Sequence, residues 1–264
     1  MKILAIGDPH EYFEYKKSIF KEVDLILLTG DIGKADIWRK MAFDRINREK
    51  KGLPEKKESK YVVKKGYMQV YNSSMKVIKY LSKFAPVYLI YGNIEHPNSY
   101  VRKLIKKIDY KLPFLSDGLN AINRVKILNN KAVNFDGIRI GGLEYFKDIN
   151  WVQDFKPSDY DKQMKKARKE TNRAKKILGK FGNLDILLCH QPPYGVLDKV
   201  EFKGAPKHWL GKHAGSKPIL SYIKRKQPPY VLCGHIHEAK GEKKIGKTKV
   251  INLGCHGDYK VISI

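Results

Sequence analysis

The chain has 264 residues, of which 42% are apolar and 11% aromatic, and this composition is typical of a globular protein. No apolar run approaches the roughly 20 residues of a membrane span, and the apolar start is too short for a signal peptide, so we expect a soluble, cytoplasmic protein. The three cysteines lie far apart without CxxC spacing. This argues against a disulfide framework or a thiolate zinc site and favours burial in the core.

The formal net charge of +26 is compatible with a nucleic-acid partner, because phosphate backbones attract dense positive charge. However, only 9 of the 53 basic residues are arginine. Planar recognition of phosphate favours arginine, whereas lysine spread over a whole chain also fits a heat-adapted surface. The charge leaves nucleic-acid binding open without assigning it.

Short apolar runs that end at polar or ionisable residues predict buried strands. In chain order they cover residues 2–8, 23–31, 86–93, 184–190 and 230–235. Apolar residues spaced by three and four predict amphipathic helices over 60–84 and 161–180, and the many lysines of the second helix form its solvated face. Residues 240–264 have the pattern of short strands.

Strands that alternate with helices predict an α/β sheet, in which ligands gather beyond the carboxyl ends of the strands. The chain shows no internal repeat and no linker, so we expect a single domain over residues 1–264. A helical insertion at about 35–84 exceeds what one crossover between strands requires. Its residues do not choose between substrate selection and self-association, and the oligomeric state stays open.

The ends of the predicted strands carry side chains that suit metal coordination. Oxygen and imidazole ligands without thiolate favour Mn, Fe, Ni, Co or Zn. Their number exceeds what one ion needs, which indicates two divalent metal ions that share a carboxylate. The candidate ligands are Asp8, His10, Asp31, Asn93, His190, His235 and His237.

The blocks around these residues resemble the calcineurin-like metallophosphoesterase superfamily, and most closely its archaeal and bacterial Icc-like phosphoesterases. They are GDPH, TGDIG, YGNIEH, CHQPP and CGHIHE, in family order over residues 8–237. The resemblance implies an α/β fold, a four-layer αββα sandwich of two mixed β-sheets flanked by helices. It also implies a first metal on Asp8, His10 and His237, a second on Asn93, His190 and His235, and Asp31 as the bridge between both.

The resemblance further implies a phosphoric ester hydrolase, in which a metal-bridging hydroxide attacks phosphorus with Asp31 and Asn93 at the reacting centre. Metal binding lowers the pKa of water from 15.7 toward about 7, so no protein nucleophile is required. Two divalent ions bring four positive charges, and Asp8 and Asp31 remove two. The surplus favours an anionic small-molecule phosphoester as substrate, and manganese is the favoured ion.

One departure from the family pattern concerns the leaving group. Many relatives carry His directly after the Asn of the third block, but Ile94 stands here, so that acid is absent. His96, His213 and His256 are candidate replacements. Glu95 matches the acidic position of the block and is expected to orient a ligand or the loop. The block without His, together with the single-domain length, favours phosphodiesters.

Residues 211–223 offer a candidate contact with substrate. Ser216 is placed to cap a helix whose free N–H groups face the site, and Lys212 and His213 directly precede it. An ordinary capped helix with Pro218 in its first turn explains the same residues equally well.

Three functional alternatives remain. A metal-dependent nuclease acting on DNA or RNA fits the basic surface and predicts activity that falls steeply with salt. A phosphomonoesterase would use the same metals. A non-catalytic scaffold is the third alternative, but scaffolds of this superfamily have lost ligands, and all seven are retained here.

Overall fold

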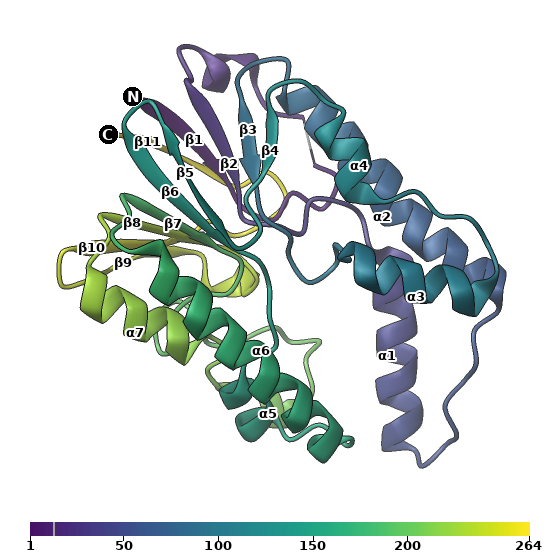
Figure 1. Ribbon diagram of the computed structural model, residues 1–264. Helices are drawn as coiled ribbons and strands as arrows, with labels where there is room; N and C mark the ends of the chain where they lie inside the picture. The colour runs from purple at the N-terminus through teal and green to yellow at the C-terminus, as the bar shows by residue number, and fades with distance from the viewer. Residues whose placement is uncertain (13) are drawn as a thin grey trace.

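The computed structural model describes residues 1–12 and 14–264, in which the strands form two mixed β-sheets (Figure 1). The first sheet has the order β11-β1-β2-β3-β4, and the second has the order β5-β6-β7-β8-β10-β9. The strands of the first sheet are β1 (Lys2–Ile6), β2 (Leu25–Leu28), β3 (Val87–Leu89), β4 (Val125–Ile127) and β11 (Tyr259–Ser263). Those of the second are β5 (Lys131–Phe135), β6 (Ile138–Leu143), β7 (Ile186–Cys189), β8 (Tyr230–Cys233), β9 (Gly241–Ile245) and β10 (Thr248–Asn252).

Most neighbouring strands run parallel. Only the pairs β1–β11, β5–β6 and β9–β10 are antiparallel among the described strands. The pairs β1–β2, β2–β3 and β7–β8 are all parallel. Because parallel strands end at the same edge of a sheet, the residues that follow β1, β2 and β3 come together, as do those that follow β7 and β8.

Helices cover the outer face of each sheet, which gives four layers (Figure 1). The helices are α1 (Asp36–Lys50), α2 (Lys60–Leu81), α3 (Asn98–Ile108), α4 (Leu115–Asn120), α5 (Ile149–Phe155), α6 (Tyr160–Phe181) and α7 (Lys217–Lys226), with the short 3-10 helices η1 (Lys17–Phe20), η2 (Lys207–Trp209) and η3 (His237–Ala239). Helices α2 and α4 pack on the first sheet, and α6 and α7 pack on the second.

Alternation along β1 shows how the sequence builds these layers. Leu4 and Ile6 face the helices, in the cluster that contains Val77 of α2. Ile3 and Ala5 point the other way, into the cluster between the two sheets. Successive side chains of a strand leave on opposite faces, so a strand that is apolar at every position must be covered on both sides. The four-layer αββα prediction is therefore confirmed.

The boundaries of the predicted helices are close to those observed. The helix expected over 60–84 is α2, which ends at Leu81, and the helix expected over 161–180 is α6. The segment assigned to a helical insertion contains α1 and α2. The sequence did not predict β4, β5 or β6. β4 has only three residues, β5 is not fully buried at any position, and β6 contains a glycine pair.

Two of the three cysteines lie where the sequence predicts. Cys189 and Cys233 are fully buried in the cluster between the second sheet and its helices. Burial raises the pKa of both thiols, which makes them inert as nucleophiles. Cys255 is only half-buried, which corrects the expectation of core packing for that residue. In the described part of the chain, no helix has the length and apolar character needed to span a bilayer.

Candidate metal centre

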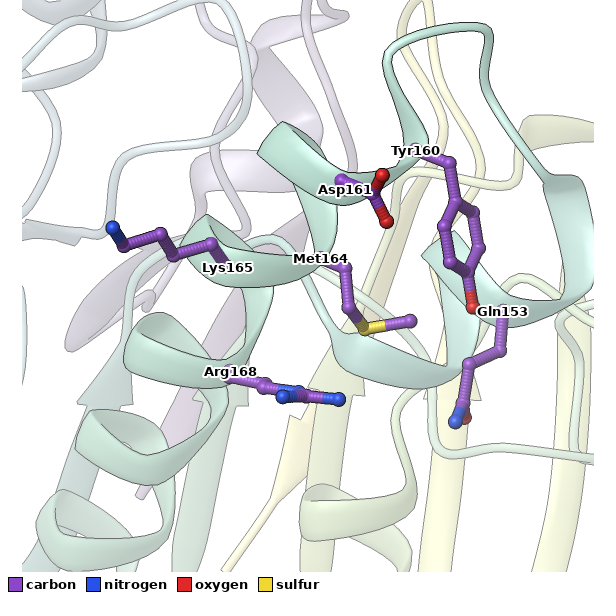
Figure 2. A pocket seen from close by; sticks show the side chains of 6 residues that line it. All are labelled: Gln153, Tyr160, Asp161, Met164, Lys165 and Arg168. Carbon is purple, nitrogen blue, oxygen red and sulfur yellow. The ribbon is translucent and has the colours of Figure 1, made fainter.

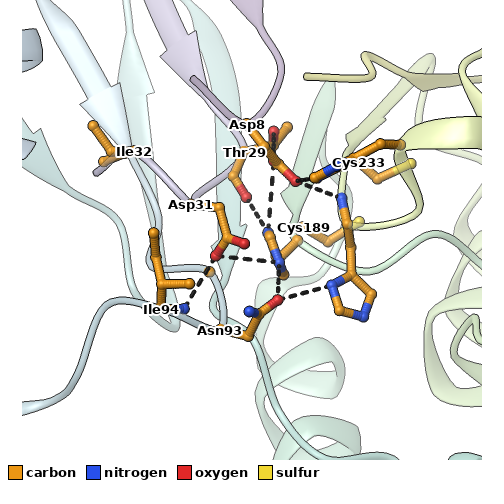
Figure 3. A network of polar contacts seen from close by, with 12 residues as sticks. Asp8, Thr29, Asp31, Ile32, Asn93, Ile94, Cys189 and Cys233 are labelled. Atoms are coloured by element: carbon orange, nitrogen blue, oxygen red, sulfur yellow. Dashed lines mark hydrogen bonds and ion pairs between the residues drawn. The ribbon is translucent and has the colours of Figure 1, made fainter. Parts of the chain in front are cut away.

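The seven candidate ligands meet at the carboxyl ends of the strands, where the two sheets adjoin. We call them the ligand cluster. Figure 3 labels three of its members, Asp8, Asp31 and Asn93. Asp8 and His10 follow β1, Asp31 follows β2 and Asn93 follows β3, all in the first sheet. His190, His235 and His237 follow β7 and β8 in the second sheet.

Asp8 is the most connected member of the ligand cluster. It is fully buried, and its Oδ1 accepts a hydrogen bond of 2.9 Å from the Thr29 hydroxyl. Its Oδ2 accepts a bond of 2.7 Å from the backbone N–H of His235 and lies 3.1 Å from His237 Nε2. Burial alone would raise the pKa of Asp8, but His190 and His237 outweigh it and lower the pKa to about 2. Asp8 is therefore an anion at neutral pH.

His190 has a defined tautomer. Its Nδ1 lies 2.9 Å from the carbonyl oxygen of Thr29, which can only accept, so Nδ1 carries the proton. In the neutral ring, Nε2 then has a free lone pair, and this atom lies 3.0 Å from Asn93 Oδ1 and 3.6 Å from Asp31 Oδ1. Such a backbone contact is how proteins orient a coordinating imidazole.

Asn93 completes a second group of donor atoms. Its Oδ1 lies 2.9 Å from Nδ1 of His235 as well as close to His190. Burial lowers the pKa of His235 to about 3, so its ring is neutral and suited to coordination. The three residues assigned to one metal by the resemblance thus converge on one point.

His10 provides the test of whether these residues fit a metal. Both of its ring nitrogens are buried, and neither has a hydrogen-bond partner among the described residues. Its Nε2 lies 3.9 Å from Asp31 Oδ2, and its ring centroid lies 5.2 Å from that of His237. A buried nitrogen without a partner destabilises the fold by about 1–3 kcal/mol, whereas a bound cation would satisfy it. The cluster fits divalent metal ions.

The donor atoms fall into two overlapping groups. Asp8, His10 and His237 form one, and Asp8, Asp31 and His190 form the other, each with donor atoms within 4.8 Å of one another. Asp8 belongs to both groups. The two oxygens of Asp31 also diverge, since Oδ2 faces His10 and Oδ1 faces His190. That divergence is compatible with the bridge that the sequence assigns to Asp31.

Glu95 holds the loops that carry the ligands. Its carboxylate accepts hydrogen bonds from the backbone N–H groups of Asp31, Ile32, Gly33 and Gly92, at 3.0, 2.8, 3.4 and 2.9 Å. Burial and the nearby Asp31 raise its pKa to about 7, against these donors, which favour the ionised form. Glu95 therefore orients the loop, as the sequence predicts.

The backbone around the cluster is strained. His10, Asp31 and His235 have positive φ values of 47, 45 and 69°, a region that non-glycine residues seldom occupy. Gly234 is needed because an added Cβ would overlap the carboxylate of Asp8. Glycine here permits close approach between the two sheets.

The candidate proton donors lie in three different places. His96 lines a cavity of about 480 Å³ that also contains Asn93, but its ring packs 4.1 Å from that of Tyr100, and burial lowers its pKa to about 4. His256 lies 5.2 Å from the His10 ring, beside a cavity of about 240 Å³. His213 is oriented by Asp198, with Nδ1 and Oδ1 2.7 Å apart.

The segment before α7 is a capped helix start. Ser216 is fully buried, and its hydroxyl donates to Asp148 at 2.7 Å and accepts from the backbone of Ile219 at 3.4 Å. The structure thus shows the ordinary cap, and the serine is not accessible to a ligand. Lys212 donates from Nζ to the carbonyl of Asp154 at 2.5 Å.

Two residues near the cluster were missed in the sequence. Thr29 orients both Asp8 and His190, and its position in the TGDIG block was the available signal. The ring of Tyr145 lies 5.8 Å from that of His190 and 5.5 Å from that of His235. Tyr145 follows β6, and because that strand was not predicted, nothing in the sequence placed this tyrosine at the site.

A further cavity of about 500 Å³ lies on α5 and α6 (Figure 2). Tyr160, Asp161 and Arg168 are among its lining residues, and none of the candidate ligands is. It provides a region for control substitutions.

Curated relatives cover different shares of the chain. The protein MJ1162 of Methanocaldococcus jannaschii is 27% identical over 216 residues, 73% of this chain and 88% of that protein. UPF0046 protein K07C11.7 of Caenorhabditis elegans is 26% identical over 140 residues, 52% of this chain and 40% of that protein. The chain spans less than half the length of the two C. elegans proteins that it matches.

Solved structures agree with the fold. One crystal structure is 16% identical and superposes with a TM-score of 0.58, covering 99% of this chain and 98% of the other. A dimetal phosphatase from Danio rerio is 11% identical with a TM-score of 0.50, covering 99% and 91%. The model of the calcineurin-like phosphoesterase family matches residues 1–239, which include every member of the ligand cluster. The chain therefore belongs to the calcineurin-like phosphoesterase family.

Proposed function

We propose that this single-domain chain is a phosphodiesterase that acts on small anionic phosphodiesters with two divalent metal ions, manganese being favoured. The observation that carries the proposal is His10, whose two buried nitrogens find no partner in the described part of the chain and lie beside the buried carboxylates of Asp8 and Asp31. Two divalent cations held there would lower the pKa of a water molecule toward about 7 and neutralise phosphoryl oxygens. The family membership supports phosphoric ester hydrolysis in general.

The residues of the chain hold and orient the reactants. Asp8 and Asp31 supply the negative charge that binds the cations. Thr29 accepts from Nδ1 of His190, which leaves Nε2 as the nitrogen available for coordination in the neutral ring. Asn93 directs Oδ1 toward His190 and His235, and no described residue accepts a hydrogen bond from its Nδ2. We assign that amide group to a phosphoryl oxygen of the substrate, where it would position the phosphorus and stabilise developing charge.

The preference for diesters rests on charge and on Ile94. A diester carries one negative charge, which suits the positive charge that remains on two divalent ions after Asp8 and Asp31 are counted. At position 94, next to Asn93, no acidic side chain is available to protonate a poor leaving group. Ile94 contributes only its backbone N–H, which donates to Asp31 Oδ1 at 3.1 Å. Turnover should therefore depend steeply on the pKa of the leaving group.

A nuclease is the second candidate, and one observation favours it. Helix α6 exposes a run of lysines, among them Lys162, Lys165 and Lys169, in a chain of formal net charge +26. Phosphate backbones bind such surfaces in a salt-dependent way.

The test combines metal analysis with a substrate panel. Metal-loaded protein is assayed on bis(p-nitrophenyl) phosphate, p-nitrophenyl phosphate and a single-stranded oligonucleotide, at low and high salt. We expect the diester to be turned over fastest, without strong dependence on salt. Asn93→Ala and His235→Ala should each lower kcat/KM by about 100-fold or more and release one ion per chain. Tyr160→Phe, in the separate cavity of Figure 2, is the control.

Each contrary result removes a defined part of the proposal. Full hydrolysis in both alanine variants contradicts the metal assignment. A faster monoester contradicts the diester preference. Oligonucleotide cleavage that exceeds aryl diester hydrolysis, and that falls steeply with salt, establishes the nuclease instead.

A further inference from the structure

A cavity of about 770 Å³ lies between helix α1 and the segments that form α5, the start of α6 and η2. Its walls include Trp151 and Trp209 on one side and Arg45 of α1 on the other. We call it the aromatic cavity. Its volume is within the range of about 300–1,000 Å³ that is usual for small-molecule sites.

Three aromatic rings form one wall of the aromatic cavity. Trp151 stacks on Phe155 with ring centroids 5.2 Å apart and an angle of 13° between the planes. Trp209 meets both edge-on, at 5.7 and 5.4 Å. Phe155 is buried beneath, whereas both tryptophans remain half-exposed. The wall thus presents indole surface to the cavity.

This wall is attached directly to the ligand cluster. Phe155 belongs to a small apolar cluster that also contains Ile236, and the two tryptophans pack against that cluster. Ile236 stands between His235 and His237, so the aromatic rings support the loop that carries two candidate ligands. The aromatic wall is therefore linked by packing to the loop between two candidate ligands.

Lys147 joins the aromatic cavity to the cavity that contains Asn93, because it lines both. Its Nζ lies 5.1 Å from the centre of the Trp151 ring and donates to Gln163 Oε1 at 2.7 Å. An ammonium group has three donors, so donors remain for an anionic oxygen. Lys147 can contact a phosphate on one side and an aromatic ring on the other.

We infer that the aromatic cavity binds a planar aromatic group of the phosphodiester, stacked on one of the two perpendicular indole rings of Trp151 and Trp209 and in edge contact with the other, while Lys147 contacts the phosphate. The inference rests on the proposed function, and it names the class of substrate. An apolar alkyl chain would also bury surface, but the half-exposed indole faces and the adjacent ammonium group favour a flat ring with a polarisable face. An aryl group and a nucleobase share this chemistry.

The first test uses three diesters that share the p-nitrophenolate leaving group and differ in the other ester group. These are methyl p-nitrophenyl phosphate, phenyl p-nitrophenyl phosphate and thymidine 5′-(p-nitrophenyl) phosphate. We expect kcat/KM for one or both aromatic esters to exceed that for the methyl ester by about tenfold or more. A gain for the thymidine ester alone identifies a nucleobase, and a gain for both identifies any aromatic ring.

The variants connect this preference to the cavity. Trp209→Leu and Trp151→Leu should each reduce the aromatic-to-methyl ratio to within about threefold of one, and Trp209→Phe should restore most of it because it keeps a ring. Tyr160→Leu removes an aromatic residue from the separate cavity of Figure 2 and should leave the ratio as in the wild type. An unchanged ratio in both leucine variants overturns the inference.

A binding measurement separates this inference from the proposed function. Quenching of tryptophan fluorescence by p-nitrobenzylphosphonate should be saturable, absent with methylphosphonate, and weakened in Trp209→Leu. If no ester is hydrolysed but this quenching is observed, the cavity binds aromatic rings and the proposed function fails. If all three esters are hydrolysed alike and saturable quenching is absent, the proposed function stands and the inference fails.

Discussion

The ligand cluster and the aromatic cavity adjoin one another but are built on opposite principles. Members of the ligand cluster follow buried strands, and they are held by hydrogen bonds to backbone and to each other. The aromatic cavity is enclosed by α1, α5 and η2, which lie outside both sheets, and its lining combines aromatic rings with basic and acidic side chains. The strands thus position the candidate metal ligands, and the segments outside the sheets form the cavity that we propose selects the substrate.

The largest expected effect breaks the ligand cluster itself. Asp31→Asn keeps the shape of the side chain but removes the negative charge of a carboxylate whose two oxygens face His10 and His190. We expect kcat/KM to fall by about 1,000-fold or more for every diester, aromatic or methyl alike, together with loss of bound metal. Kinetics and metal analysis measure this. A selective loss for aromatic esters would contradict the division between the two regions.

Glu95→Gln is a milder way to disturb the cluster. Backbone N–H groups now donate to both carboxylate oxygens of Glu95, and in the variant an amide NH2 would replace one of these oxygens and face the donors. We therefore expect a loss of about 1–3 kcal/mol in the free energy of unfolding. Activity should fall by about 10–100-fold, because the loop that carries Asp31 is displaced. Urea unfolding and kinetics are the measurements. Glu144→Gln is the control, because Glu144 lines the Asn93 cavity but accepts from side chains and from no backbone N–H group of the described residues. Equal losses in both variants would contradict the role of Glu95.

Ile94→His sharpens the comparison by adding function to the cluster. The backbone N–H that holds Asp31 is retained, and an imidazole is placed where many family members carry one. We expect roughly a tenfold gain for diesters with poor leaving groups and little change for p-nitrophenolate. A series of aryl leaving groups measures the slope against pKa. Ile94→Leu should keep the wild-type slope, and a parallel slope in Ile94→His would contradict the missing-acid explanation.

The smallest expected effect concerns an ion-pair contact whose residues belong to neither the ligand cluster nor the lining of the aromatic cavity. Glu242 of the second sheet lies 2.6 Å from Lys249 and 2.6 Å from Lys260, and Lys260 belongs to β11 of the first sheet. These lysines lower the pKa of Glu242 below its usual 4.5. Its contribution to stability is therefore present above pH 4.5 and is lost as the pH falls through the lowered value.

Because this contact is partly exposed, Lys260→Met should reduce the free energy of unfolding by less than about 1 kcal/mol at pH 7, and by less still in high salt. Lys243→Met on the neighbouring position of β9 is the matched control. Urea titrations at pH 7 and pH 4 measure the difference. A larger loss at pH 4 than at pH 7 would contradict the sign.

The structure brings the candidate ligands together, and the sequence indicated this convergence for a physical reason. Each candidate ligand follows an apolar run, and parallel strands of one sheet end at one edge, so Asp8 converges with Asn93 in the first sheet and His190 with His237 in the second. The meeting of the two edges followed from the resemblance. Glu95 was predicted from the same block. The resemblance predicted the two sheets and the outer helices. Apolar runs such as the one that forms β1 predicted strands that are covered on both faces.

The aromatic cavity could not be predicted in this way. Trp151 and Trp209 are separated by 57 intervening residues, they follow no buried strand, and their contact depends on how α5 and η2 pack. Ser216 illustrates the opposite error, since a helix start that looks suited to an anion is satisfied internally by Asp148. Tyr145 was hidden because β6 carries glycines at positions 141 and 142 and lacks the dense apolar pattern of its neighbours.

The ligand cluster takes its members from both sheets, and this has a consequence for the architecture. A cation bound to Asp8 and His237 fastens one sheet to the other at their shared edge. Resistance to heat and to proteases should therefore rise with the concentration of free ion, because ligands that bind only the folded chain stabilise it. A chelator should therefore destabilise the packing between the two sheets as well as stop turnover.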